Sequence, residues 1–237
     1  MAQINLTLHH VPCYGVTEQK SSETNLDVTI VSDITSEGNP SGPDPQSLYL
    51  KVNETVTKYS LYLVNISFLK KVYQPTEVIA ELQVTGGSTI PMSTLENTFK
   101  HVKVELKCDA AEDAIGSDYY VHEVQARYKK DGMYILLKIY SLDKLLTINQ
   151  VSRAFVAQKL ADGEKSILTT EMAKYKKPYT ITDQNENGTV GFDASNMQHL
   201  RDGGKEHIHP YLVQYNESFY DFLARTANRW GEFMYYE

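Results

Sequence analysis

Cysteine is scarce in this chain, which excludes the classes of protein that depend on clustered thiols. The 237 residues contain two cysteines, Cys13 and Cys108, and they lie far apart in the sequence. Such a pair forms neither a disulfide framework nor the short spacings of a zinc site. We therefore expect two reduced thiols in a protein that is made in the cytoplasm.

Long hydrophobic runs and basic clusters are missing as well. No apolar run reaches the roughly 20 residues that cross a bilayer, and the start of the chain alternates like a strand instead of resembling a secretory signal. The formal net charge is −7, and the densest basic cluster holds three lysines. We expect no stable membrane insertion and no nucleic-acid partner, since binding to nucleic acid needs a basic surface.

Sequence motifs of catalysis are also absent. The chain has no Gly-x-Ser-x-Gly elbow, no phosphate-binding loop and no His-Glu-x-x-His helix. Its one histidine cluster comprises His199, His207 and His209, and a His-x-His strand can hold zinc. Solvated loop histidines explain this cluster more simply, so we predict no enzyme activity, no metal site and no cofactor.

Strand-forming patterns are abundant, and they dominate the first two thirds of the chain. Alternating hydrophobicity predicts strands in residues 1–35, 48–70, 101–107, 119–128 and 133–142. Asp131-Gly132 is typical of a tight hairpin turn between the last two. Residues 36–47 hold three prolines and two glycines and predict a flexible loop, while Pro75 predicts the start of a short helix. Several short antiparallel strands with one wet face favour a closed or nearly closed barrel.

The last third of the chain has a different character. Helical spacing covers residues 162–175, and a polar, glycine-rich loop is expected over 185–204. A strand over 209–215 precedes Ser218, which is a good N-cap for a helix. The apolar stripe of that helix comprises Phe219, Phe222, Leu223, Ala227 and Trp230. Residues 232–236 predict a final strand without a partner, so we expect a second domain that is incomplete at its C-terminal end.

The segment from Leu212 to Tyr236 resembles the signature of the valine-glycine-repeat (Vgr, VgrG-type) spike proteins of type VI secretion systems and their contractile-phage tail-hub relatives. That signature is a strand ending Val-Gln-Tyr-x-Glu-Ser, a helix Phe-x-Phe-Leu-x-Arg and a Gly-aromatic strand. Upstream, Ser152-Arg153-Ala154-Phe155 is similar to the passage that leaves the first barrel of the family. The residues at matching positions are Arg153, Phe155, Gln214, Tyr215, Glu217, Ser218, Asp221, Phe222, Leu223, Arg225, Gly231 and Tyr235.

The resemblance covers the second half of the chain well and residues 1–100 only in pattern. Val72-Tyr73-Gln74-Pro75 and the long N-terminal extension are more similar to the Bacteroidetes branch of the family. The family fold implies a mainly β tail-hub barrel over 1–155 and a smaller α+β hub domain over 156–237. The barrel and the spike that follow the hub in complete family members are absent from these 237 residues.

The function implied by the resemblance is that of a structural hub. Three copies would form a ring that joins the tail tube to a spike used for effector delivery. The implied partners are further copies of the chain, an Hcp-like tube protein, and spike, effector and baseplate proteins. Assembly would occur in the cytoplasm, followed by delivery through the contractile apparatus without a signal peptide.

Alternative interpretations remain open at the level of sequence. Tyr119-Tyr120, Tyr211, Tyr215 and Tyr220 could stack sugars, which would suit a carbohydrate- or peptide-binding β module at a cell surface. A hydrolase with an unrecognised site is a third hypothesis. Within the motif, Glu217 and Arg225 either form an ion pair at a domain or subunit junction or belong to a solvated helix face.

Overall fold

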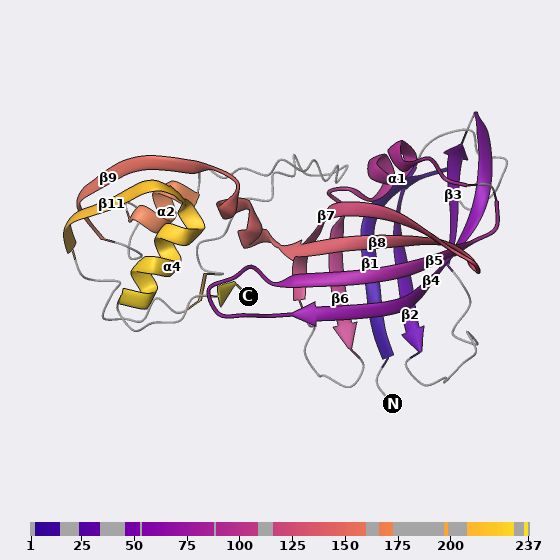
Figure 1. Ribbon diagram of the computed structural model, residues 1–237, viewed down its shortest axis with the longest axis horizontal. Helices are drawn as coiled ribbons and strands as arrows, with labels where there is room; N and C mark the ends of the chain where they lie inside the picture. Colours follow the sequence, from indigo (N-terminus) through magenta and orange to yellow (C-terminus); the bar gives the residue numbers. More distant parts are fainter. Residues whose placement is uncertain are drawn as a thin grey trace. The chain divides into compact units, whose positions relative to one another are not determined.

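Two compact units make up the chain in its computed structural model (Figure 1). The structure describes residues 3–14, 24–33, 46–52, 54–87, 89–108, 116–159, 166–172, 197–198, 208–229 and 235–236. The first unit holds strands β1 to β8 and helix α1, and Tyr140 is the last of its described residues. The second unit begins at Ser141 and also includes the turn Leu69–Thr76 between two strands of the first.

The first unit is an eight-stranded antiparallel sheet that is nearly closed into a barrel. Its strand order is β2-β1-β6-β7-β8-β5-β4-β3. The end strands β2 and β3 lie side by side, and just beyond β1 the Tyr14 N–H donates to the Tyr49 carbonyl at 2.9 Å. The strands are β1 (Gln3–Cys13), β2 (Thr24–Asp33), β3 (Gln46–Val52), β4 (Thr55–Leu69), β5 (Glu77–Thr85), β6 (Lys103–Cys108), β7 (Gly116–Lys129) and β8 (Gly132–Ser141).

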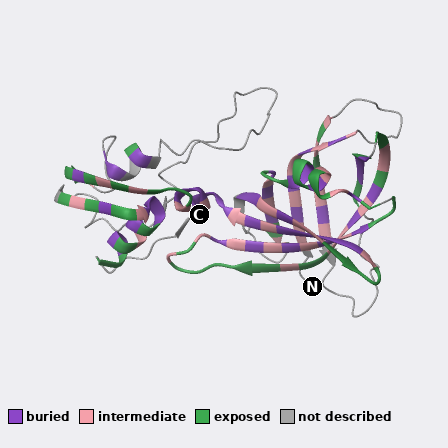
Figure 2. Ribbon diagram, turned by 45° about the horizontal axis from the view of Figure 1, so that its top comes forward, coloured by how far each residue is buried: buried purple, intermediate pink, exposed green. Residues whose placement is uncertain are grey.

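The alternation read from the sequence accounts for the barrel core, and the predicted barrel class is confirmed at this level. Val104 and Leu106 of β6 point inward with the predicted inner residues Ile135, Leu137 and Ile139 of β8, and all five are at most 1% exposed. Figure 2 shows the same alternation along the barrel strands, mainly between buried residues and residues of intermediate exposure. A sheet with one dry and one wet face gains its stability from this inner face.

The predicted hairpin between β7 and β8 is present. Gly132 follows Asp131 in the turn with φ 137°, a backbone conformation that side chains disfavour and glycine adopts readily. Of the predicted flexible loop 36–47, residues 36–45 lie outside the described part of the chain, whereas Gln46 and Ser47 already belong to β3.

The helix predicted at Pro75 is wrong, because this segment forms strand β5. Val78, Ala80, Leu82 and Val84 are buried at every second position, and β5 pairs with β8 in continuous register. Val78 and Leu82 are four positions apart, a spacing that fits one face of a helix and one face of a strand equally well. Pairing with β8 along the whole segment decides between them.

Helix α1 (Met92–Phe99) was missed by the sequence analysis. It follows Pro91, and its backbone begins with the Leu95 N–H donating to the Pro91 carbonyl at 3.1 Å. Leu95 and Phe99 are fully buried in the barrel core, and α1 packs on β1, β3 and β7. The signal in the sequence was the spacing of Leu95 and Phe99, because two apolar residues four positions apart lie on the same face of a helix.

The second unit is small and mixed, and its described residues form four strands, two α-helices and one 3-10 helix. Its strands β9 and β11 pair in one two-stranded sheet, and β10 and β12 pair in another. No helix among the described residues is long and apolar enough to cross a membrane. The elements are the 3-10 helix η1 (Leu142–Thr147), β9 (Gln150–Lys159), α2 (Ile167–Met172), β10 (Met197–Gln198), β11 (Ile208–Ser218), α4 (Phe219–Arg229) and β12 (Tyr235–Tyr236).

Three expectations for this unit need correction or completion. The final strand was predicted to lack a partner, but β12 pairs antiparallel with β10. Met197 and Gln198 of β10 lie within the loop expected over 185–204, whose other residues are outside the described ones. The helix expected over 162–175 is described only as α2, Ile167–Met172. Distant pairing of this kind leaves no mark in a local pattern.

We predict that Phe99→Ala lowers the free energy of unfolding of the barrel by about 3–5 kcal/mol, because it opens a cavity beneath α1. Met92→Ala on the same helix is the control, since Met92 is 38% exposed and the change should cost less than about 0.5 kcal/mol. Urea unfolding of both variants measures the difference. Equal losses would contradict the packing of α1 on the barrel.

Candidate functional site

The candidate site is the ribbon formed by β9 and β11, because it carries half of the residues of the predicted motif. The two strands pair antiparallel, with Phe155 opposite Leu212 and Arg153 opposite Gln214. Successive side chains of a strand point to opposite faces. Phe155 contacts Phe222 of α4 at 5.4 Å between ring centroids, and Arg153 binds Glu171 of α2, so this face is covered by helices. Figure 1 shows both helices beside the ribbon.

A β-bulge in β11 joins the ribbon to α4. The register shifts between Gln214 and Glu217, and Asn216 adopts a left-handed backbone with φ 48°. The fully buried Gln214 side chain donates from Nε2 to the Glu217 carbonyl at 2.9 Å, which spans the bulge. The Asn216 N–H donates to Ser152 Oγ on β9 at 3.0 Å. Both strands therefore help to hold the bulge, which re-aims β11 into the helix.

We call the helix-covered face of the ribbon the inner face. Arg153 is the centre of the polar contacts on it. Its Nε donates to Gln214 Oε1 at 2.8 Å, and its Nη1 donates to Glu171 Oε2. The guanidinium also lies 5.6 Å from the Phe155 ring centroid and 5.5 Å from that of Phe219. Stacking on aromatic faces and pairing with a buried carboxylate are both favourable for arginine. One side chain thus connects β9, β11, α2 and α4.

Ser218 caps α4 as the sequence predicts. Its Oγ accepts the Asp221 N–H at 3.0 Å and donates to Asp221 Oδ2 at 2.6 Å. The hydroxyl satisfies one of the free N–H groups of the first turn, and a carboxylate there also suits the helix dipole. The predicted apolar stripe is buried where it is described, at Phe219, Phe222, Leu223 and Ala227. Trp230 and Gly231 lie outside the described residues, and of Tyr235 the structure describes only the backbone.

Arg225 and Glu217 form an ion pair within the second unit, while its predicted place at a domain or subunit junction stays a prediction. Arg225 donates from Nη2 to Glu217 Oε1 at 2.6 Å and from Nε to Oε2 at 3.2 Å. Its Nη2 also donates to the Val213 carbonyl at 2.9 Å. The hydrogen bonds that Arg225 donates to Glu217 raise the pKa of Arg225 above its usual value. Within the second unit, the hydrogen bonds from Arg225 to Glu217 and Val213 hold α4 against β11.

Glu171 is a site residue that was not predicted from the sequence, although a signal was present. Glu171 follows Ile167 by four positions, which places a charged residue on the buried side of a short helix. Both residues are buried, with exposures of 5% for Glu171 and 0% for Ile167. A carboxylate in such a position requires a partner, and Arg153 supplies one.

The outer face of the ribbon is apolar and open. It consists of residues at alternate positions of both strands, with Tyr211 opposite Val156 and Val213 opposite Ala154. Tyr211 is 62% exposed, Tyr215 76% and Val156 63%. In contrast, Tyr119, Tyr120 and Tyr220 are buried, so those three of the sugar-stacking candidates belong to the interior. We call the set Ala154, Val156, Tyr211, Val213 and Tyr215 the outer face.

A second polar cluster of this unit surrounds Asp143 at the start of η1. The Thr76 N–H donates to Ser141 Oγ at 2.9 Å, and Ser141 Oγ donates to Asp143 Oδ1. Asp143 is 1% exposed, and its Oδ2 and the Tyr220 hydroxyl are buried atoms without a hydrogen-bond partner among the described residues. Burial raises the pKa of Asp143 to about 6, although the bond from Ser141 opposes this. Burial and the charge of Asp143 raise the pKa of Tyr220.

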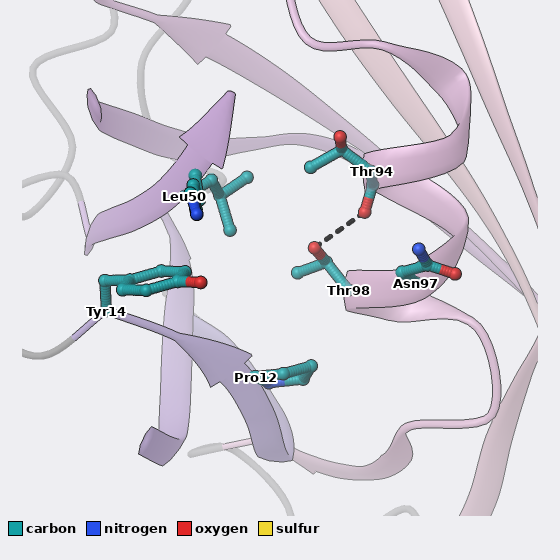
Figure 3. A pocket seen from close by; sticks show the side chains of 7 residues that line it. Pro12, Tyr14, Leu50, Thr94, Asn97 and Thr98 are labelled. Atoms are coloured by element: carbon teal, nitrogen blue, oxygen red, sulfur yellow. Dashed lines mark hydrogen bonds between the residues drawn. The ribbon is translucent and has the colours of Figure 1, made fainter. Parts of the chain in front are cut away.

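A pocket of about 240 Å³ lies in the first unit between α1 and the ends of β1 and β3. Thr94, Asn97 and Thr98 extend from α1, and Pro12, Tyr14 and Leu50 lie across from them (Figure 3). The Thr98 hydroxyl donates to the Thr94 carbonyl at 2.7 Å. Nothing in the sequence analysis pointed to this pocket, because its walls come from three distant segments.

The structure contains no cluster of three or more His, Cys, Asp or Glu side chains suited to a metal ion within its described residues. The histidine cluster of the sequence analysis cannot be placed, because His199 and His207 lie outside the described residues and the side chain of His209 is not described. No protein-family model matches the chain, and no curated protein sequence matches it.

Replacing Gln214 tests the inner-face contacts. Gln214→Leu keeps the volume but leaves Arg153 Nε and the Glu217 carbonyl without their partner. We expect a loss of about 1–3 kcal/mol in the stability of α4, measured by hydrogen exchange of its amides. Gln158→Leu is the matched control, because Gln158 is exposed on β9. A loss no larger than that of the control would show that the Gln214 contacts add no stability.

The Asp143 cluster predicts a dependence of stability on pH. The pKa is about 6 in the folded state and lies near its ordinary value of 3.8 after unfolding. The folded state therefore holds the proton more tightly, so stability is greatest below pH 4 as far as this group is concerned and falls as the pH rises to 6. The effect is about 3 kcal/mol at most. Asp143→Asn should remove this decline, which urea unfolding across the pH range can measure; an unchanged decline would assign it to other groups.

Proposed function

We propose that this chain is the structural hub of a type VI secretion spike or of a related contractile tail. Three copies form a ring that joins the tail tube to the spike used for effector delivery. The observation that carries the proposal is the arrangement of the motif residues. Arg153, Phe155, Gln214, Glu217 and Arg225 bind one another or the same helix, although 72 positions separate the first from the last.

This network has a structural character that suits a hub. Its charged members are engaged in ion pairs, Arg153 with Glu171 and Arg225 with Glu217. They rigidify a ribbon and a helix instead of presenting reactive groups in a cleft. A component that transmits the force of a contractile tail needs such fixed geometry more than it needs catalysis. We therefore propose no enzymatic role and no cofactor for this chain.

The outer face supports contact between copies. It is built from five residues without charge, and its two tyrosines and Val156 are more than 60% exposed. The chain has a net charge of −7, so copies repel one another over most other surfaces. An uncharged, tyrosine-bearing patch is where identical chains meet at least electrostatic cost. Neighbours in a ring use heterologous contacts, in which this face meets a different surface of the next copy.

The remaining partners follow from the resemblance of the motif. An Hcp-like tube protein docks on one side of the ring, and spike, effector and baseplate proteins attach to it. Assembly takes place in the cytoplasm, and delivery occurs through the contractile apparatus, without nucleic acid and without stable membrane insertion. The tail-hub type of the barrel is part of the same proposal.

The native mass of the purified chain tests the proposal. We expect three copies of the 26.9 kDa subunit by native mass spectrometry and light scattering. Tyr211→Ser combined with Tyr215→Ser should shift the protein toward monomers, because the outer face loses both aromatic contacts. Tyr128→Ser is the control, since Tyr128 is 63% exposed on the barrel.

A wild-type chain that stays monomeric at every concentration would contradict the hub. A trimer that survives the double change would keep the hub but show that the contact between copies lies outside the outer face. The protein isolated from its own cells adds a second readout. A subunit heavier than 26.9 kDa that assembles as three copies supports a hub joined to a spike.

A further inference from the structure

The pocket beside α1 is formed because the helix has an apolar face in the barrel core and small polar residues on the neighbouring face. Leu95 and Phe99 are fully buried in the barrel core. Thr94, Asn97 and Thr98 stand at i, i+3 and i+4, so they share a neighbouring face of the helix. This second face looks toward the ends of β1 and β3, where large apolar residues would have filled the space. Small polar residues leave it open instead.

The size of the pocket limits what it can hold. Its volume of about 240 Å³ is below the ~300–1,000 Å³ of sites that take drug-sized ligands. The volume therefore suits a single six-membered ring with its substituents, and the rest of a larger ligand would lie outside the pocket. Pro12, Tyr14 and Leu50 provide one wall, and the Tyr14 ring points into the pocket from the end of β1 (Figure 3).

The chemistry of the walls favours a ligand with one apolar and one polar side. The Tyr14 ring and the Pro12 side chain offer carbon surface, whereas Leu50 is 2% exposed and belongs to the barrel core. Opposite them, the Asn97 amide both donates and accepts hydrogen bonds, and the Thr98 hydroxyl, which donates to Thr94, still has acceptor capacity. Lys51 is the charged residue of the lining, and its Nζ pairs with Glu54 at 2.7 Å. The local charge is thus balanced, which disfavours an anion.

We propose that this pocket binds one neutral sugar ring, the terminal pyranose unit of a glycan. A pyranose has the required two-sided character, with C–H groups on one face and hydroxyls around its edge. The C–H face packs on Tyr14 and Pro12, and the hydroxyls bond to Asn97, Thr94 and Thr98. Because the pocket is open to solvent, the rest of a glycan chain extends outward. This ligand site belongs to the barrel and does not depend on the formation of a ring of copies.

Titration of the full chain with neutral methyl glycosides tests the site. The probes are methyl glucoside, methyl galactoside and methyl N-acetylglucosaminide, with inorganic phosphate as the anionic probe. Chemical-shift changes of backbone amides report where each probe binds. For a ligand of this size we expect a dissociation constant in the roughly millimolar range and shifts confined to the end of β1, β3 and α1.

Two variants make the test specific. Asn97→Ala removes the amide, keeps the helix intact because alanine favours helix, and should weaken binding about tenfold. Ser93→Ala on the same helix is the control, since Ser93 is exposed and does not line the pocket; its affinity should equal that of the wild type. Saturable shifts at the pocket that Asn97→Ala weakens would support the proposal.

Other outcomes would overturn it. The absence of shifts at the pocket with all three glycosides would exclude a neutral sugar. Shifts that Asn97→Ala leaves unchanged would place binding elsewhere. Saturation by phosphate without saturation by glycosides would assign the pocket to an anion instead.

Discussion

A two-stranded ribbon has too little buried surface to be stable alone in water, and the second unit is organised around this constraint. β9 and β11 gain their stability from one face, which α2 and α4 contact through Arg153 and Phe155. Burying a guanidinium there is unfavourable unless it is paired. Glu171, Gln214 and two aromatic rings meet that need. Arg153 thus connects both helices to the ribbon and, through Gln214, contacts the bulge of β11.

The barrel is stabilised by a continuous apolar core instead of by a paired charge. Its core is a continuous set of aliphatic and aromatic side chains, and α1 adds Leu95 and Phe99 to it. The helix therefore acts as part of the core on one face and as the wall of a pocket on the next. A fold that packs one face of a helix tightly leaves an adjacent face free for polar residues. Binding chemistry can be placed there without weakening the interior.

Local patterns predicted the elements that local chemistry decides. The alternation of β6 and β8, the Asp131-Gly132 turn and the Ser218 cap each depend on a few neighbouring residues, and the structure has all three. Elements decided by distant pairing were not predictable in this way. Val78 and Leu82 fit a helix or a strand, and the partnership with β8 settles the matter. The pairing of β12 with β10 and of Arg153 with Glu171 likewise joins segments that no single window of sequence contains.

The Arg153 contacts also constrain how this sequence can change. Residues 153, 171 and 214 come from three separate segments, and each supplies a partner that another needs. Replacing one alone leaves a buried charge or amide unpaired, which is more destabilising than replacing the whole set by apolar residues. A chain that drifts over evolutionary time is thus expected to keep the three together or to exchange them together. In the sequences of any relatives, covariation among these three positions would then reflect the packing around Arg153.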